Sequence, residues 1–265
     1  MEHPGASLAS LDGEIMPAAE ATIPATDDGL LRGDGVFEVV RVYDGRPFAL
    51  EAHFTRLRRS ALSLRLALDL ETVRAEAHRL LAHAGAGPDH ELLRILVTRG
   101  GRRLLLTEPL PGSAERIRLS CVTYSPTRIL DQVKSLSYAA NMLAGRLARE
   151  RGFDEALLVT PHGRVLEAPT SSFFWIEGET VLTPPLEDHI LASITRAAVI
   201  ALTDAREQPC TLADLAGADE AFLASTTREV QPVAAIDERD FPASGPLTAR
   251  AAAALSSHIQ AELRA

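Results

Sequence analysis

The alternation of apolar and polar positions predicts two regions of mixed helix and strand. In the first, Val36–Tyr43 is rich in β-branched and aromatic residues, stops at Asp44-Gly45 and resumes at Pro47–Leu50, a pattern typical of a β-hairpin with an Asp-Gly turn. Apolar residues then recur at helical spacing from Glu51 to Leu66 and from about Leu70 to Ala86. Further strands are expected at Ser7–Leu11, Glu91–Arg99 and Arg116–Tyr124.

The second region begins with a helix from about Ala139 to Arg151, which Gly152 stops. Ser193 is a suitable N-cap for a helix from Ile194 to Asp204. Strands are expected at Glu155–Thr160, Arg164–Pro169, Ser172–Ile176 and Glu220–Ser225, and a last amphipathic helix at Pro246–Arg264. The whole pattern predicts a two-domain α+β / α/β fold, with a small N-terminal domain at 1–124, a linker at 125–133 and a C-terminal domain at 134–265.

Composition and charge reduce the number of functional classes to which the protein could belong. With 46% hydrophobic and 24% charged residues, the 265-residue chain is able to bury a sizeable core. A formal net charge of −9 argues against a nucleic-acid partner. Cys121 and Cys210 lie far apart without metal-like spacing, so they are expected to be small core residues. Neither a secretory signal nor an apolar run of membrane-spanning length is evident, and we expect a cytoplasmic protein without membrane contact.

Lys134 is the only lysine of the chain, since the other residues among the 27 lysines and arginines are all arginine. A general bias towards arginine explains this scarcity, but not why one lysine remains in the segment Val133-Lys134-Ser135-Leu136. A lysine amine forms a Schiff base with an aldehyde, whereas arginine does not. We therefore favour a chemical role for Lys134 over that of an ordinary surface lysine.

Three further features add to this hypothesis. Glu167, 33 residues after Lys134, ends an expected strand; such a glutamate either faces solvent or, when buried, keeps a pyridine nitrogen protonated. The helix start at Ser193-Ile194-Thr195-Arg196 offers backbone N–H groups to an anion. Thr226 and Thr227 add hydroxyls after a strand, and Arg56 is suited to a bidentate contact. Taken alone, each is more typical of an ordinary helix cap, a turn or a solvated face than of a binding site.

In this order, these residues resemble those of the fold-type IV enzymes that use pyridoxal 5'-phosphate (PLP), also called class IV aminotransferases. Within that family, the D-amino-acid transaminases are the most similar. The motifs are Gly-Asp-Gly-Val-Phe-Glu-Val-Val at 33–40, Val-Lys-Ser-Leu at 133–136, Ile-Thr-Arg at 194–196, Ser-Thr-Thr-Arg-Glu-Val at 225–230 and Val-Ala-Ala-Ile-Asp at 233–237. The resemblance therefore covers nearly the whole chain.

The resemblance implies a role for each matched residue. Lys134 would be the catalytic lysine, which carries PLP and then shuttles a proton. Glu167 would pair with the ring nitrogen, and Leu191 would pack on the face of the ring. The phosphate would be held by Arg56, Ile194, Thr195, Thr226 and Thr227. The family also implies a homodimer and an active site that lies between the two domains.

The chain departs from the family pattern where substrate is recognised. Ser193 replaces a frequent glycine, and Phe37 replaces the tyrosine that helps to bind the substrate carboxylate in D-amino-acid transaminases. The arginine and histidine of that carboxylate trap have no counterpart in residues 98–104. Arg32 and Arg99 are therefore our candidates for a differently placed carboxylate clamp, with Arg102 and Arg103 as alternatives.

The leading hypothesis is a transaminase that moves an amino group between a D-amino acid and an α-keto acid. The segment Lys134-Ser135-Leu136-Ser137 also fits 4-amino-4-deoxychorismate lyase, which releases pyruvate and 4-aminobenzoate, whereas Ser225–Val230 favours the transaminase. A branched-chain transaminase is disfavoured because the Phe-Glu-Gly and Gly-Asn-Tyr segments are absent, and an (R)-amine transaminase ranks with it. A non-catalytic PLP-binding protein of the same fold is disfavoured by the intact Lys134 and Glu167.

Overall fold

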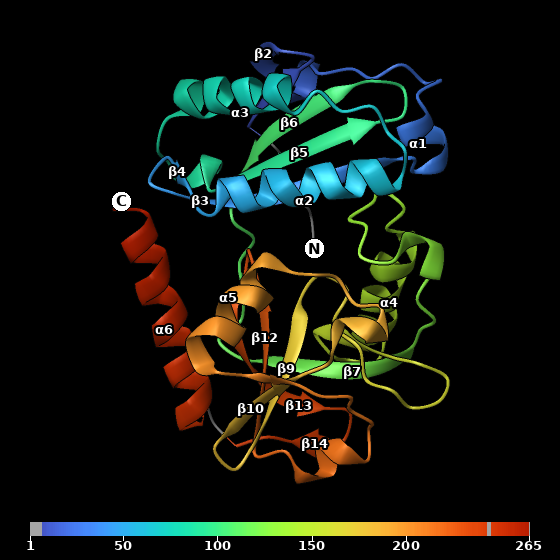
Figure 1. Cartoon of the computed structure of the whole chain (residues 1–265), viewed down its shortest axis with the longest axis vertical. Helices are drawn as coiled ribbons and strands as arrows, with labels where there is room; N and C mark the ends of the chain where they lie inside the picture. Colours follow the sequence, from blue (N-terminus) through green and yellow to red (C-terminus); the bar gives the residue numbers. More distant parts are fainter. Residues whose placement is uncertain (1–6, 243–244, 265) are drawn as a thin grey trace. The chain divides into compact units, whose positions relative to one another are not determined.

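The computed structural model describes residues 7–242 and 245–264 and divides the chain into two compact units of mixed helix and sheet (Figure 1). Unit 1 comprises Met1–Gly112, Val133–Tyr138 and Glu262–Ala265. Unit 2 comprises Ser113–Gln132 and Ala139–Ala261.

Unit 1 is built on a sheet in which each strand runs antiparallel to its neighbour, in the order β2-β1-β6-β5-β3-β4. The strands are β1 (Leu8–Leu11), β2 (Glu14–Pro17), β3 (Gly35–Tyr43), β4 (Arg46–Pro47), β5 (Leu92–Thr98) and β6 (Arg103–Glu108). The expected hairpin at Asp44-Gly45 is confirmed, although β4 ends at Pro47 because α2 (Leu50–Ser63) begins three residues later.

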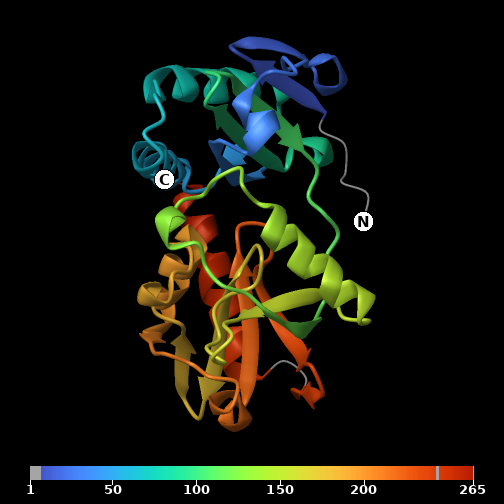
Figure 2. The same cartoon turned by 90° about the vertical axis from the view of Figure 1, so that its right-hand side faces the viewer.

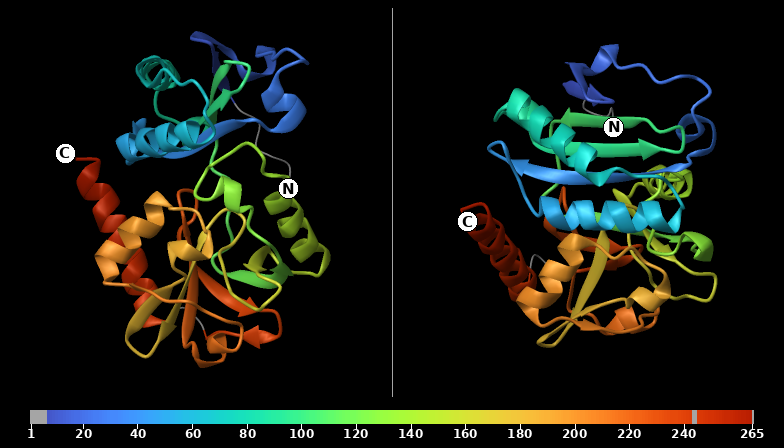
Figure 3. Two further views of the ribbon diagram at one scale, coloured as in Figure 1. Left: turned by 45° about the vertical axis from the view of Figure 1, so that its right-hand side comes forward. Right: turned by 45° about the horizontal axis from the view of Figure 1, so that its top comes forward.

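The helices α2 and α3 (Leu70–Ala84) pack on one face of this sheet (Figure 3). Their apolar stripes meet alternate residues of the strands because side chains along a strand point to opposite faces. The result is one buried cluster that includes Val36, Phe54, Leu57, Leu80 and Ile95. Unit 1 also contains the short helix α1 (Asp28–Arg32) and the 3-10 turns η1 (Ala18–Glu20) and η2 (Pro88–His90).

Unit 2 is built on a larger, curled sheet in the order β11-β10-β9-β12-β13-β7-β8, with β14 paired to β13 (Figure 1). The strands are β7 (Ile117–Thr123), β8 (Glu155–Val159), β9 (Ser172–Glu177), β10 (Thr180–Thr183), β11 (Arg206–Glu207), β12 (Glu220–Ser225), β13 (Glu229–Ile236) and β14 (Arg239–Asp240). The β7·β8, β7·β13 and β10·β11 pairs are parallel, and the others are antiparallel.

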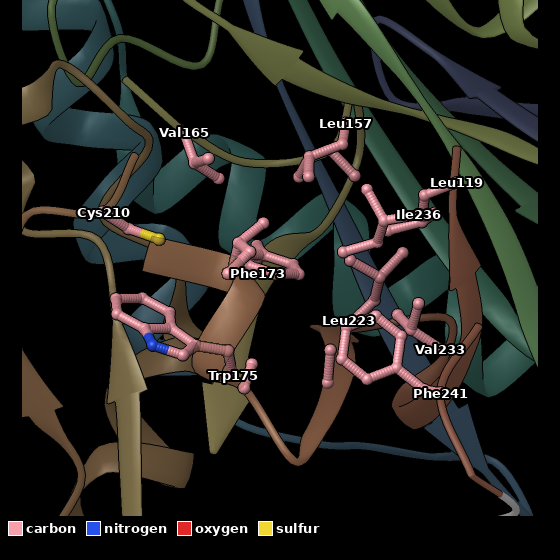
Figure 4. Close-up of a cluster of buried hydrophobic side chains, with 14 of the residues drawn as sticks. Leu119, Leu157, Val165, Phe173, Trp175, Cys210, Leu223, Val233, Ile236 and Phe241 are labelled. Carbon is pink, nitrogen blue, oxygen red and sulfur yellow. The ribbon is translucent and has the colours of Figure 1, made fainter. Parts of the chain in front are cut away.

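Inside the curl lies a dense apolar core (Figure 4). The rings of Phe173 and Trp175 stack with their centroids 6.2 Å apart, in the same buried cluster as Leu119 of β7 and Val233 of β13. Cys210 is buried in this core and forms no disulfide, as its expected role as a small core residue requires. On the other side of the sheet α4 (Ala139–Glu150) packs on β7 and β8 (Figure 2). Unit 2 further contains α5 (Ile194–Thr203), α6 (Pro246–Glu262) and the 3-10 turns η3 (Arg128–Leu130), η4 (Leu186–Asp188) and η5 (Asp214–Gly217).

The structure corrects two expectations about secondary structure. Residues 164–169 form no strand; Arg164, Val165 and Ala168 make only isolated bridges. Strands β2, β6, β10, β11, β13 and β14 were not expected; in β6 the apolar run Leu104-Leu105-Leu106 does not alternate, so its period does not identify a strand.

The division into units also differs from the expected boundaries of 124 and 134. Residues 113–124 belong to unit 2, because β7 pairs in parallel with β8 and β13. Residues 133–138 belong to unit 1, because Ser135 bridges to Val36 at the edge of β3. Both contacts join residues far apart in sequence, which local patterns do not reveal. No helix within the described ranges is both long and apolar enough to cross a membrane.

Candidate active site

Lys134 is held by its backbone at the edge of the sheet of unit 1. Its carbonyl accepts a hydrogen bond of 3.0 Å from the amide of Phe37, and its own amide donates to Oγ of Ser60 at 3.1 Å. The next two residues continue the contact, through the bridge of Ser135 to Val36 and a bond from the amide of Leu136 to Gly35 O. The lysine backbone is therefore anchored on both sides.

The Gly-Asp-Gly motif at 33–35 makes room for this anchored segment. A Cβ at Gly35 would lie 2.5 Å from the carbonyl oxygen of Val97 and 2.6 Å from Leu136, closer than such contacts allow. Gly33 has φ +67, and a Cβ there would crowd Ser137, which donates to its carbonyl. The Gly-Asp-Gly segment at 33–35 and the lysine segment at 134–137 are about 100 residues apart in sequence. They can lie against each other because Gly33 and Gly35 have no side chain.

The Lys134 side chain reaches an aromatic pair. Its Nζ lies 4.4 Å from the ring centroid of Phe37 and 6.0 Å from that of Tyr138, and the two rings meet edge to face at 5.4 Å. The negative face of an aromatic ring attracts an ammonium group, so the pair orients the amine. Sequence reasoning did not select Tyr138; its position four residues after the lysine was the available signal.

Arg56 belongs to a buried group of charges between α2 and β3. Its Nε and Nη2 donate to the two carboxylate oxygens of Glu38 at 2.7 and 2.6 Å, and Glu38 Oε2 lies 2.8 Å from Nδ1 of His53. Glu38 is 0% exposed and Arg56 7%. Burial alone would raise the pKa of Glu38, but the hydrogen bonds and charge of Arg56, with a lesser part from His53, lower it to about 2.

Burial also governs His53, whose pKa is lowered chiefly by desolvation and further by the positive charges of Arg56 and Lys134, against the opposing effect of Glu38. His53 is therefore neutral near pH 7. Because ionised Glu38 only accepts hydrogen bonds, Nδ1 of His53 carries the proton and donates it. Neither Glu38 nor His53 was predicted as a site residue, although the Val-Phe-Glu motif contains the first.

In unit 2, Glu167 Oε1 accepts a hydrogen bond of 3.1 Å from the backbone amide of Leu191. Its own carbonyl accepts from the amide of Leu158 in β8, which fixes the glutamate next to the sheet. Tyr124 lies near enough that the charge of Glu167 adds to burial in raising the pKa of the tyrosine hydroxyl. Two residues predicted for the cofactor ring, Glu167 and Leu191, are thus in direct contact.

The start of α5 lies just beyond Leu191. The Ser193 side chain caps it by accepting from the amide of Arg196 at 3.2 Å, which confirms the expected N-cap. The amides of Ile194 and Thr195 remain at a helix N-terminus, where the helix dipole favours an anion. The guanidinium of Arg196 is held elsewhere, by Glu207 and by the carbonyl of Pro184 at 2.7 Å.

The predicted hydroxyl donors follow β12, which packs against α5. Ser225 Oγ lies 3.5 Å from the Thr227 hydroxyl and accepts from the amide of Arg228, so the chain turns at Thr226. Within the residues that the structure describes, the hydroxyls of Thr195 and Thr226 have no hydrogen-bond partner, and both are suited to donate to a phosphate.

The arginines suggested for substrate binding are all paired within unit 1. Arg32 on α1 pairs with Asp28 and is 70% exposed. Arg99 donates twice to Asp34, at 3.0 and 3.2 Å, and also to the carbonyls of Leu64 and Arg65, so it ties the end of β5 to the end of α2. Arg102 pairs with Asp12 and Arg103 with Glu76.

Comparison with known proteins identifies the family. Residues 35–236 match the family model of amino-transferase class IV, and the chain belongs to that family. It is 34% identical to a putative branched-chain-amino-acid aminotransferase of Methanocaldococcus jannaschii, over 86% of this chain and 88% of the relative. It is 31% identical to a D-alanine aminotransferase of Bacillus licheniformis, over 95% of this chain and 96% of the relative.

Two further similarities bear on activity and fold. A bifunctional aminodeoxychorismate lyase / D-amino acid transaminase of Mycobacterium tuberculosis is 29% identical, over 89% of this chain and 93% of the relative. A solved fold IV-transaminase from Curtobacterium pusillum is 29% identical, with a TM-score of 0.82 over 96% of this chain and 99% of the other. The expected fold type and enzyme class are therefore confirmed.

Class IV aminotransferases use PLP, and the residues of unit 2 fit this cofactor. An anion site needs donors without competing partners, which the first amides of α5 and the hydroxyls of Thr195 and Thr226 provide. A pyridinium needs an acidic partner, and Glu167 is oriented by the amide of Leu191. The described residues hold no cluster of three or more acidic, histidine or cysteine side chains suited to a metal.

Proposed function

We propose that this enzyme transfers the amino group of a D-amino acid to an α-keto acid. The observation that carries the proposal is the sole lysine, held at the edge of β3 by Phe37 and Ser60 with its amine beside two aromatic rings. Support for a D-amino acid comes from the likeness to D-alanine aminotransferase over 95% of the chain. Bound PLP would supply an electron sink for the negative charge that develops at the substrate Cα.

In this mechanism, the residues assigned to the site have separate tasks. Nζ of Lys134 would hold the cofactor and, once the substrate amine has replaced it, would take the proton from the substrate Cα and return it to the cofactor carbon on the other side of the substrate nitrogen. Glu167 keeps a proton on the pyridine nitrogen. The first amides of α5, the hydroxyls of Thr195, Thr226 and Thr227, and the Arg56 guanidinium hold the phosphate, while Leu191 packs on the ring.

The substrate carboxylate needs a cation, and we propose Arg32 for it, with Arg99 as the second candidate. Arg32 is the better suited because its single ion pair with Asp28 is largely exposed and exchanges readily with solvent. Arg99 is already committed to a carboxylate and two carbonyls. Phe37, in place of a tyrosine, offers the substrate an apolar ring instead of a hydroxyl.

We further propose that the enzyme is a homodimer. Leu30 and Leu31 of α1 are 66% and 60% exposed beside the charged Arg32 and Asp34. Large apolar side chains next to charged ones are typical of an interface with a polar rim. Sedimentation equilibrium tests this proposal: an active monomer contradicts it.

Two alternatives have specific support. The likeness to a bifunctional lyase and transaminase supports 4-amino-4-deoxychorismate lyase activity. The 34% identity to a putative branched-chain-amino-acid aminotransferase supports a branched-chain L-amino acid as donor, although the Phe-Glu-Gly and Gly-Asn-Tyr segments are absent.

The decisive experiment incubates the PLP-loaded enzyme with a panel of D-amino acids, branched-chain L-amino acids and (R)-amines, each with pyruvate or 2-oxoglutarate. Chiral product analysis then identifies donor and acceptor. Higher kcat/KM for D-amino acids supports the proposal, and higher values for branched-chain L-amino acids or (R)-amines overturn it. Adding 4-amino-4-deoxychorismate and measuring 4-aminobenzoate tests the lyase.

A further inference from the structure

We propose that Arg228 is a positioning residue, which holds the turn between β12 and β13 in the shape that presents the Thr226 and Thr227 hydroxyls to the phosphate of the cofactor. The proposal rests on the phosphate role of these threonines in the proposed function, and it assigns a task to an arginine that the proposed function does not use. All the residues that carry it belong to unit 2.

The turn is short and its exit is strained. β12 and β13 pair as far as Ser225 and Glu229, so only residues 226–228 connect the two strands. Glu229 has φ +53, in the left-handed region that residues with a Cβ disfavour. Backbone of this kind persists where the surrounding contacts over-determine it. The conformation that places the two threonines therefore depends on what holds the turn.

The backbone of Arg228 closes the turn. Its amide donates to Oγ of Ser225 at 3.3 Å, and the same oxygen lies 3.5 Å from the hydroxyl oxygen of Thr227. Serine hydroxyls commonly accept from backbone amides a few residues along the chain. Ser225 is 7% exposed, so water competes little for this contact. The positions of Arg228 and Thr227 are thus coupled through one serine hydroxyl.

The side chain of Arg228 connects the turn to other parts of unit 2. Nη2 donates to Oε2 of Glu155, at the start of β8, at 3.2 Å, and Nη1 donates to Oε1 of Gln231 in β13. Gln231 in turn donates to the carbonyl of Ala114 at 2.6 Å. Both partners of the guanidinium are buried, at 7% exposure for Glu155 and 4% for Gln231. The arginine therefore anchors the turn to fixed groups.

The Glu155 carboxylate is itself fixed. Its Oε1 accepts from the amide of Ala156 at 3.1 Å. Gly145 of α4 leaves room for it, since a Cβ there would lie 2.9 Å from Oε1, closer than real Cβ contacts. Glycine inside a helix is less favourable than alanine, so this glycine serves space and not helix stability. Oε2 is thereby directed to the arginine.

Burial makes the pairing important. It lowers the pKa of Arg228, while the charges of Glu155 and Asp154 and the hydrogen bond to Glu155 oppose this change. Only 19% of the arginine side chain is exposed, so loss of the Glu155 charge would leave a poorly hydrated cation without compensation. The guanidinium would then turn towards water, and the turn would lose its anchor.

Unit 2 contains two matched controls. Glu220, at the other end of β12, is 7% exposed like Glu155, and its carboxylate accepts from two backbone amides at the start of α6, at 3.2 and 2.8 Å. Glu220→Gln therefore removes an equally buried charge without touching the turn. Arg116 donates from Nη2 to two backbone carbonyls at 2.9 and 2.6 Å, so Arg116→Met is the control for the arginine.

The experiment measures the dissociation constants of PLP and of pyridoxal, which lacks the phosphate, for the apoenzyme and its variants by fluorescence titration. We expect Arg228→Met and Glu155→Gln to weaken PLP binding by about tenfold and pyridoxal binding by less than about threefold, because hydroxyl contacts to the phosphate are lost. Glu220→Gln and Arg116→Met should keep the wild-type ratio of the two constants.

The outcomes separate the inference from the assignment beneath it. If the double variant Thr226→Val/Thr227→Val keeps the wild-type ratio, the phosphate role of the threonines falls, and the inference with it. If that variant loses the preference for PLP and Arg228→Met does not, only the positioning role is overturned. A direct contact of Arg228 with the phosphate would leave Glu155→Gln at the wild-type preference or above, which also overturns it. Equal weakening of both ligands by Arg228→Met reduces the arginine to a general structural residue.

Amide hydrogen exchange in the apoenzyme tests the anchor without any ligand. Exchange in residues 225–231 should be faster in Glu155→Gln than in wild type, with little change in the rest of unit 2. Arg228→Lys provides a second variant in case Arg228→Met does not fold, because an ammonium keeps the charge but lacks the planar fork that reaches both Glu155 and Gln231. Wild-type exchange in Glu155→Gln, or a wild-type preference for PLP in Arg228→Lys, would overturn the proposal.

Discussion

The backbone amide of Leu191 donates a hydrogen bond of 3.1 Å to Oε1 of Glu167. This contact joins a loop residue before α5 to the segment that follows β8, and it orients the carboxylate that we assign to the pyridine nitrogen. Because a glutamine side chain also offers an Oε1 acceptor, the contact allows a substitution that removes the charge and keeps the geometry.

We expect Glu167→Gln to bind PLP but to turn over far more slowly. An ionised partner typically shifts a neighbouring pKa by about 1–3 units, so its loss weakens proton binding at the ring nitrogen by roughly 10- to 1,000-fold. The measurement is single-turnover kinetics with a D-amino acid at saturating PLP. Wild-type rates would show that Glu167 does not serve the ring nitrogen.

We expect Lys134→Ala to lose the visible absorbance of lysine-bound PLP and all transamination while remaining folded. The hydrogen bonds of Lys134 with Phe37 and Ser60 use only its backbone, so alanine preserves them and removes the contact of Nζ with the Phe37 ring. Absorbance spectra and borohydride trapping test the first part, and thermal unfolding tests the second. Cofactor that borohydride still fixes to the variant would contradict the assignment, since no other lysine is present.

Part of this site was predictable from the sequence, because some of its signals are local. Lys134 stands out as the only lysine, Ser193 precedes an apolar period that needs a cap, and β12 occupies the expected range Glu220–Ser225. These features depend on residue identity and short spacing. They require no knowledge of what packs against them.

The rest depends on contacts that local patterns do not encode. The buried Glu38 reaches His53 and Arg56 only because α2 folds back onto β3, and in sequence Glu38 is a polar residue in an apolar strand. The bridge between Val36 and Ser135 similarly joins Lys134 to unit 1 across about 100 residues. Contacts of this kind set the boundaries between the two units. They also explain why Glu38 and His53 were not predicted as site residues.

The N-cap of α5 provides a prediction on stability. We expect Ser193→Ala to lower the free energy of unfolding by about 1 kcal/mol, because the amide of Arg196 loses its acceptor, and Ser193→Gly, the frequent residue of the family, to lower it by only a few tenths. Urea unfolding measures the difference. Ser256→Ala on the exposed side of α6 is the control, and an equal effect there would remove the cap from the explanation.

Acid should lower the free energy of unfolding, because the buried Glu38 carboxylate becomes protonated. Its pKa is lowered to about 2 from a usual 4.5, so its contribution to stability is fully present above 4.5 and is lost as the pH falls towards 2. A shift of this size corresponds to about 3 kcal/mol. His53 also makes the protein less stable in acid. Its pKa is lower in the folded protein than the usual 6.5, so as the pH falls below 6.5 the unfolded chain binds a proton at His53 more readily than the folded protein does.

Urea unfolding at several pH values between about 7 and 3 measures this dependence. Glu38→Gln should be less stable than wild type at neutral pH, since Arg56 loses its buried partner, but its stability should fall less steeply in acid. Parallel pH profiles for the two proteins would show that Glu38 does not carry the acid sensitivity.

The last prediction separates Arg32 from Arg99 as ligands of the substrate carboxylate. We expect Arg32→Ala to raise KM for amino acids by about tenfold or more, with little effect on a primary amine that lacks a carboxylate, because a charge-assisted contact to the carboxylate is lost. Arg99→Ala should lower the unfolding temperature and impair both substrate types, because it releases Asp34 and the carbonyls of Leu64 and Arg65. Steady-state kinetics with both substrate types, alongside thermal unfolding, distinguish the two. A selective KM effect of Arg99→Ala, with Arg32→Ala unchanged, would reverse the assignment; equal losses for both substrates in both variants would remove each arginine from carboxylate binding.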